Sequence, residues 1–147
     1  SEKSFWDVIK LSKAPIICSH SSSMAMCKHD RNLTDEQLKA LAQNGGVAQV
    51  CLLDRYINED YKNASLTDAI EHIDHMVKVA GIDHVGIGSD FDGGGGIIGC
   101  ESDNDFIQIT VKLIEKGYTE EDIAKIWGGN LMRVLDEVQA TASVKTL

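Results

Sequence analysis

The chain has 147 residues, a hydrophobic content of 43% and a formal net charge of -9. This length supports one domain with a buried core, and the hydrophobic content excludes an intrinsically disordered chain. The acidic balance argues against binding to nucleic acid or to an anionic membrane surface, because both require a basic face. No apolar run reaches the roughly 18 residues of a membrane-spanning helix, so the sequence predicts no transmembrane segment.

The first half of the chain alternates helical and strand patterns. Residues 4–12 carry apolar side chains at helical spacing, and the apolar run over 14–18 predicts a short strand. A helix is expected over 34–43. Thr34 is at its N-cap position and Gln37 follows three residues later, which is the spacing of a capping box. The second strand is expected over 47–53, and the loop of about 12 residues after it is long enough to suggest a functional role.

The second half repeats the alternation and then becomes helical. A helix that starts at Ser65 or Thr67 and runs to residue 80 is followed by a third predicted strand over 84–88. A helix over 104–116 and a short helix that opens at Thr119 come next. A glycine pair breaks that short helix, and Asn130 is expected to cap a last helix that ends near residue 139. Each strand is short, apolar and followed by a helix, which is typical of βα units in a parallel sheet.

Three parallel strands are few for a finished sheet, because such a sheet needs both faces covered and its edges protected. The chain is therefore expected to be part of a larger βα architecture, with one partial domain over 1–140 and a tail over 141–147. It opens on Ser1 without a methionine, so a fragment or a processed product is expected. An open sheet of this kind should expose apolar strand surface and favour oligomerisation.

The four cysteines form no C-x-x-C pair, which argues against a zinc knuckle or a thioredoxin motif. Cys18 and Cys51 fall in predicted buried strands and are interpreted as ordinary core residues. This cysteine usage favours a reducing compartment, and therefore the cytoplasm.

Polar side chains follow each of the three predicted strands. The first strand ends at His20, the second leads to Tyr56, and the third ends at Asp90 before a run of glycines. The carboxyl ends of parallel strands meet at one face of a βα barrel, where catalytic residues gather. Histidine, aspartate and arginine together can bind a metal, shuttle a proton and clamp a carboxylate.

Each of these residues also has a purely structural interpretation. His20 is either a metal ligand or a loop histidine bonded to nearby hydroxyl groups. Arg31 either clamps a substrate carboxylate or forms an exposed ion pair with Asp30 or Asp35, which contributes little energy. Asp90 is either a functional carboxylate or part of an ordinary aspartate-glycine turn. The residues alone leave these alternatives open.

The remaining histidines and the tryptophans are interpreted as structural. His72 and His75 share one helix face, but apolar residues interleave them and no third ligand is near in the sequence. His84 opens a strand at the end away from the expected site. Trp6 and Trp127 are expected to be core aromatics.

Four segments in order along the chain, APIICSHSS, RNLTDEQLKA, HIDHMVKVAGIDHVGIGSDFDG and NLMRVL, resemble the membrane (renal) dipeptidase family of zinc metallopeptidases. The resemblance implies a (β/α)8 TIM-type barrel of which this chain is the C-terminal portion, about three βα units with the terminal helices. It also implies hydrolysis of dipeptides at a site that holds two zinc ions.

Carried over by position, the resemblance assigns a role to four residues. His20 corresponds to a zinc ligand, and Arg31 corresponds to the residue that holds the free carboxylate of the substrate. Asp90 corresponds to the catalytic carboxylate that passes a proton from the metal-activated water, and Tyr56 lines the substrate pocket. The family's other zinc ligands are not found in this sequence, so the ligand set is expected to be incomplete.

Three hypotheses follow from this incompleteness. The first is a zinc dipeptidase portion that works in an oligomer or with the missing N-terminal portion. The second is a non-catalytic truncated barrel that binds partners or assists assembly. The third is another βα-barrel hydrolase that uses one metal ion. Dipeptides are the expected substrate under the first hypothesis.

Overall fold

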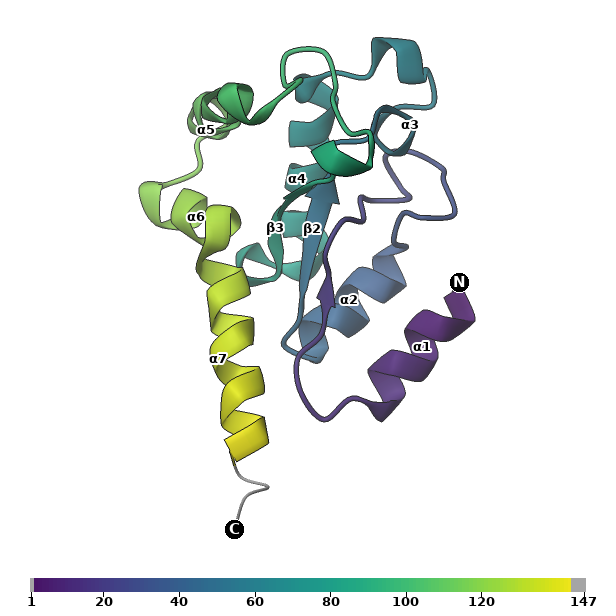
Figure 1. Ribbon diagram of the computed structural model, residues 1–147, viewed down its shortest axis with the longest axis vertical. Helices are drawn as coiled ribbons and strands as arrows, with labels where there is room; N and C mark the ends of the chain where they lie inside the picture. The colour runs from purple at the N-terminus through teal and green to yellow at the C-terminus, as the bar shows by residue number, and fades with distance from the viewer. Residues whose placement is uncertain (1, 144–147) are drawn as a thin grey trace.

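The computed structural model describes residues 2–143 and is of the α/β class. Its three strands, β1 (Ile17–Cys18), β2 (Val47–Cys51) and β3 (Val85–Ser89), form a parallel sheet in the order β1-β2-β3 (Figure 1). Successive strands are connected through helices, as expected for βα units. The helices are α1 (Glu2–Leu11), α2 (Asp35–Gln43), α3 (Asp54–Ile57), α4 (Leu66–Ala80), α5 (Phe106–Glu115), α6 (Glu120–Ala124) and α7 (Asn130–Ser143).

Strand β1 is shorter than the apolar run that predicted it. Proline at position 15 has no backbone N–H to contribute to a ladder. The Asn44 side chain takes the place of a neighbouring strand, because its Oδ1 accepts from the backbone N–H of Ile16 at 2.9 Å. Its Nδ2 donates to the Ala14 carbonyl at 3.3 Å. Only Ile17 and Cys18 therefore pair with β2.

The predicted helix starts are confirmed by their capping geometry. The Thr34 side chain accepts from the Gln37 N–H, and the Gln37 side chain bonds back to the Thr34 N–H. Ser65 and Asp68 form the same reciprocal pair at the start of α4. Helix α4 ends at Gly81, whose φ of 93° is readily adopted by glycine. Local sequence chemistry thus defines both ends of the helix that covers the sheet.

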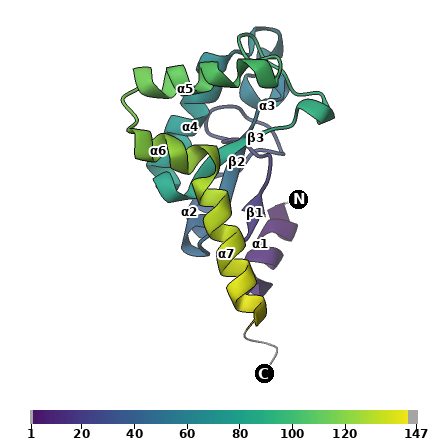
Figure 2. The same ribbon diagram turned by 60° about the vertical axis from the view of Figure 1, so that its left-hand side comes forward.

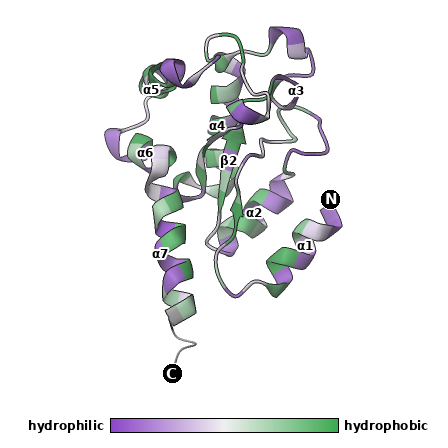
Figure 3. Ribbon diagram, in the orientation of Figure 1, coloured by the Kyte–Doolittle hydropathy of each residue, from purple (hydrophilic) through white to green (hydrophobic). Residues whose placement is uncertain are grey.

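The core lies between the sheet and helices α2 and α4. Hydrophobic residues are concentrated on β2 in Figure 3, whereas they alternate with hydrophilic residues along α7. Burying these side chains removes apolar area from water, which is the main favourable term in folding. Helices α5, α6 and α7 follow one another along one side of the molecule, and α1 lies on the other (Figures 1 and 2). The central core residues include Leu38, Leu41, Ala48, Val50, Ile70, Ile73, Met76 and Val85.

The expectation that both tryptophans lie in the core is wrong for Trp6, which is 38% exposed. Phe5 and Ile9, one helical turn apart, are the α1 residues that pack on the core. The Trp6 ring instead makes an edge contact with the Phe5 ring, at 5.2 Å between centroids. Trp127 does pack on the core, and its Nε1–H donates to the Thr110 hydroxyl at 2.9 Å.

Exposed apolar side chains lie more on helices than on strands. Among the strand residues of the described part, only Ile17 is an exposed large hydrophobic residue, at 47%. None of the helices in residues 2–143 is long and apolar enough to cross a membrane. The exposed apolar positions of α5 and α7 are Ile107, Val111, Ile114, Met132, Leu135 and Val138.

Asn130 is not the helix cap that the sequence predicts. Its backbone is already helical (φ -66°, ψ -40°), because the helix breaks earlier, at Gly128 of the expected glycine pair, whose backbone is not helical (φ 178°, ψ -20°). The buried side chain instead donates to the carbonyls of Ile82 and Val85, at 2.7 and 2.8 Å. Helix α7 continues to Ser143, beyond the expected end, and the rest of the expected tail, 144–147, lies outside the described residues.

We expect Asn130→Ala to lower the free energy of unfolding by roughly 2 kcal/mol, because two backbone carbonyls at the start of β3 lose their donor. Urea denaturation measures this loss. Asn63→Ala is the control, since the Asn63 amide bonds only the exposed Asp60 carboxylate, and it should cost less than about 0.5 kcal/mol. Equal losses in both variants would contradict the role assigned to Asn130.

Candidate active site

The chain that follows each strand is bonded to its neighbour at the carboxyl edge of the sheet. The backbone N–H of Ser21, just past β1, donates to the Gln49 carbonyl of β2 at 2.8 Å. On the other side, the Leu52 N–H donates to the Ser89 carbonyl at 2.8 Å. These bonds place the three polar strand ends at one edge, as parallel βα topology predicts.

His20 and Arg31 are in direct contact. The Arg31 Nη2 lies 2.9 Å from His20 Nε2, and His20 Nδ1 lies 2.8 Å from the Ser19 hydroxyl. A guanidinium group has only donors, so His20 Nε2 accepts through its lone pair. The ring proton is then on Nδ1 and is donated to Ser19. The Nε2 lone pair of His20 therefore accepts from Arg31, and a metal bound at Nε2 would have to displace this hydrogen bond.

Arg31 is held by aromatic neighbours and not by an acidic side chain. Its guanidinium carbon lies 5.9 Å from the centroid of the Tyr56 ring, within the range of a cation–π contact. The His29 ring lies against the Tyr56 ring, with 4.4 Å between the two ring centroids. Asp35, which was one proposed ion-pair partner, is instead bonded to His75 at 2.8 Å. The arginine side chain is therefore exposed and available to an anionic ligand.

Asp90 occupies an unusual backbone conformation at the end of β3. Ser89 and Asp90 both have positive φ, 30° and 72°, which non-glycine residues adopt rarely. The Asp90 carbonyl accepts from the N–H groups of Gly93 and Gly95, at 3.1 and 2.8 Å. A Cβ at Gly93 would collide with the Asp90 carboxylate, and one at Gly95 would lie 2.7 Å from the Asp90 carbonyl. Asp90 is therefore part of a glycine-rich turn, and this turn is compatible with a functional role for its carboxylate.

Cys51 is a part of this edge that the sequence did not identify. It was interpreted as a core residue, and it is indeed fully buried. Its Sγ nevertheless lies 3.6 Å from Asp90 Oδ2. The sequence feature that could have identified Cys51 is its position at the end of the second strand, beside the strand that leads to Asp90.

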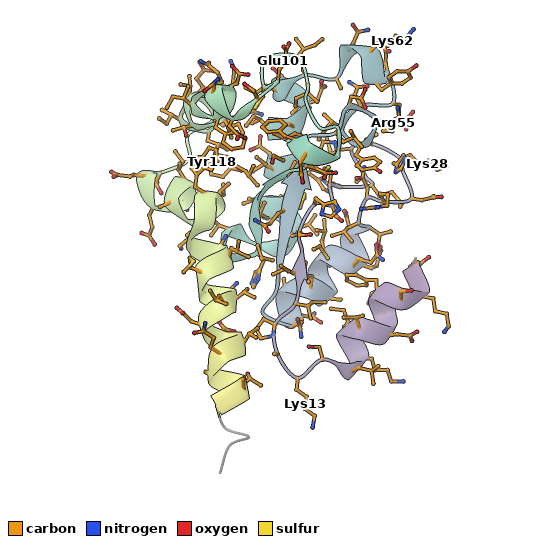
Figure 4. The ribbon with its side chains drawn as sticks, in the orientation of Figure 1. Lys13, Lys28, Arg55, Lys62, Glu101 and Tyr118 are labelled. Atoms are coloured by element: carbon orange, nitrogen blue, oxygen red, sulfur yellow. The ribbon has the colours of Figure 1, made fainter. Side chains whose placement is uncertain are left out.

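Arg55, a neighbouring polar residue, does not take part in this cluster. It forms an exposed pair with Asp54 at 3.6 Å and lies over the Tyr61 ring. Figure 4 shows Arg55 at the edge of the molecule, between Lys28 and Lys62 in that view.

His72 connects the loop that carries His20 to the segment that carries Tyr56. Its Nδ1 accepts from the Ser23 N–H at 3.0 Å, and its Nε2 donates to the Ile57 carbonyl at 2.9 Å. The ring is 1% exposed, and burial lowers the pKa of His72 to about 4. The structural role predicted for this histidine is confirmed. His84 is also structural, since its Nδ1 lies 2.8 Å from the Gly46 carbonyl before β2.

The described residues do not by themselves form a metal site. Within residues 2–143, no group of three or more His, Cys, Asp or Glu side chains is arranged to hold a metal ion. His20 offers one imidazole lone pair, whereas a zinc site needs three or four protein ligands. Any metal bound here would therefore need ligands beyond this set.

The parallel βα units and the polar residues at their carboxyl ends are typical of a portion of a βα-barrel enzyme. The family model "Membrane dipeptidase (Peptidase family M19)" matches residues 1–147. The chain therefore belongs to the membrane dipeptidase family, and the resemblance seen in the sequence is confirmed.

Curated relatives are longer than this chain. It is 41% identical over 144 residues to Dipeptidase ataJ of Aspergillus terreus, covering 97% of this chain and 35% of that protein. It is 37% identical to Dipeptidase aclJ of Aspergillus oryzae, covering 92% of this chain and 32% of that protein. The chain thus spans about a third of the length of these relatives.

Solved structures confirm the fold class as part of a dipeptidase barrel. The probable dipeptidase PvdM from Pseudomonas aeruginosa superposes with a TM-score of 0.89 and 31% identity, covering 95% of this chain and 49% of that chain. A metallopeptidase from Rhodobacter sphaeroides, bound to a phosphinate mimic of the dipeptide L-Ala-D-Ala, gives a TM-score of 0.88 and 31% identity. That match covers 93% of this chain and 40% of the other.

We expect stability to fall as the pH decreases from 6.5 toward 4, because burial lowers the pKa of His72 to about 4 from its ordinary 6.5. Between these two pH values His72 binds a proton in the unfolded chain but not in the folded chain. The free energy of unfolding therefore falls, by roughly 3 kcal/mol at the acidic end. Urea denaturation across this range measures it. His72→Gln should flatten the dependence. His75→Gln is the control and should retain it, and the same slope in both variants would contradict the assignment.

Proposed function

We propose that this chain is part of a zinc-dependent dipeptidase and supplies its carboxylate clamp and its proton-transfer group. Membership of the membrane dipeptidase family supports the reaction class. The single observation that carries the proposal is the placement of His20, Arg31 and Asp90 at one edge of the sheet. The expected substrate is a dipeptide with a free C-terminal carboxylate.

Arg31 is the proposed binding group for the substrate carboxylate. Its guanidinium is exposed, and its contacts with His20 and the Tyr56 ring limit its orientation. A guanidinium fork matches a carboxylate through two parallel hydrogen bonds, which fixes both position and angle. Recognition of the C-terminal carboxylate near the reacting bond restricts the substrate to short peptides. Tyr56 forms part of the same wall of the site.

Asp90 is the proposed proton-transfer group. Its carboxylate accepts a proton from the attacking water as the water oxygen bonds to the peptide carbonyl carbon. The same proton then passes to the amine nitrogen as the carbon–nitrogen bond breaks. His20 is proposed as one zinc ligand through its Nε2 lone pair, with the other ligands supplied by other parts of the barrel. Bound zinc would supply Lewis-acid activation of water and carbonyl.

We expect Asp90→Asn to lower kcat for an alanine-containing dipeptide by at least about 10²-fold in the zinc-loaded whole protein. The amide cannot accept the proton, but it keeps the shape of the side chain, so zinc content should be unchanged. Asp92→Asn is the matched control, because Asp92 is exposed two residues further along the same turn. Turnover retained in Asp90→Asn would overturn the assignment.

We expect Arg31→Met to lower kcat/KM for a dipeptide by about 10²-fold, because two charge-assisted hydrogen bonds are lost. The discriminating measurement uses the same dipeptide with its C-terminus amidated. Wild type and variant should then differ little, since neither can form the carboxylate pair. Arg55→Met, which changes an arginine outside the cluster, should behave as wild type. An equal loss on both substrates would assign Arg31 a structural role.

A further inference from the structure

Cys51 and Asp90 face each other across two neighbouring strands. In the β2–β3 ladder, Cys51 pairs with Ser89, and the register shifts between Val50 and Cys51. Such an irregularity re-aims the side chains that follow it. It brings the Cys51 Sγ to 3.6 Å from Asp90 Oδ2 and 3.9 Å from the Ser89 carbonyl.

The position of the Cys51 sulfur is fixed by its surroundings. Both backbone groups of Cys51 bond to one hydroxyl: its N–H donates to the Ser22 Oγ at 3.2 Å, and its carbonyl accepts from the same Oγ at 3.2 Å. Cys51 and Ser22 are both fully buried. The serine belongs to the loop that carries His20, so this contact joins the ends of β1 and β2, and the Cys51–Asp90 contact connects them to the end of β3.

Burial and the neighbouring Asp90 carboxylate keep the Cys51 thiol protonated. Burial is the largest cause of a raised Cys51 pKa, a backbone hydrogen bond at Leu53 lowers it, and the Asp90 carboxylate raises it, so that the pKa of Cys51 is about 12. Arg31 acts in the opposite direction as a smaller cause. A protonated thiol is a hydrogen-bond donor, and the nearest charged acceptor is the Asp90 carboxylate.

We propose that Cys51 is a positioning residue for Asp90, whose carboxylate is held between the Cys51 thiol and the backbone of Gly93. The thiol donates to Oδ2, and the missing side chain of Gly93 leaves room for the carboxylate on the opposite side. Rotation of the carboxylate is therefore restricted before substrate binds. The inference rests on the proposed function, because it assigns Cys51 an effect on the reaction that Asp90 performs.

The contact can be tested without turnover through the infrared S–H stretching band of the purified chain. A thiol that donates to a carboxylate absorbs at a lower frequency than an unbonded one. We expect a shifted component that disappears in Cys51→Ala and moves toward the unbonded position in Asp90→Asn. Cys100→Ala is the control, since Cys100 is also fully buried and should leave that component unchanged. Absence of an Asp90-dependent component would overturn the inference.

The effect on catalysis is tested by two variants of similar size in the zinc-loaded whole protein. Cys51→Ala removes the donor and should lower kcat about tenfold with KM unchanged. Cys51→Ser also loses the large sulfur atom, but it keeps an O–H donor at the same position, so it should recover most of kcat. Equal losses in both variants would indicate packing alone and overturn the inference. A wild-type protein with the shifted band but no dipeptide hydrolysis would contradict the proposed function while supporting the thiol contact.

Discussion

The central strand β2 is completely buried, and hydrogen bonds at its carboxyl end connect it to the chain that follows β1 and to the last residue of β3. These bonds include Ser21 N–H to the Gln49 carbonyl on one side and Leu52 N–H to the Ser89 carbonyl on the other. Because the sheet is parallel, every strand end lies at the same edge. The positions of His20 and Asp90 therefore depend on the backbone of β2.

A second group of contacts fixes the loops against the helices. His72 on α4 holds the loop after β1 through Ser23 and the end of α3 through Ile57. Asn32 holds the loop before α2 in the same way, because its Nδ2 donates to the carbonyls of Cys27 and Tyr56 at 2.8 Å. Loops that carry binding residues need such support, since they have few ladder bonds of their own.

The backbone at the end of β3 illustrates how a strained conformation is maintained. Two successive non-glycine residues, Ser89 and Asp90, adopt positive φ at a cost on the order of 1 kcal/mol each or more. The N–H groups of Gly93 and Gly95 offset part of this cost by bonding to the Asp90 carbonyl. The carboxylate is thereby directed toward Cys51 at the sheet edge. Strain of this kind is most often found where a side chain must be oriented for a ligand or a reaction.

The sequence by itself determined the local structure: the capping box at Thr34, the α/β order and the polar residues after each strand, because these depend on neighbours a few residues away. Prediction from the sequence failed where contacts between distant segments decide the role of a residue. Asn130 was expected to cap a helix, but its side chain bonds the backbone at the start of β3. Only the tertiary structure showed that Arg31 meets His20 and that Cys51 meets Asp90. Such pairs join segments that are far apart along the chain, so their geometry depends on sheet register and helix packing, which no local pattern encodes.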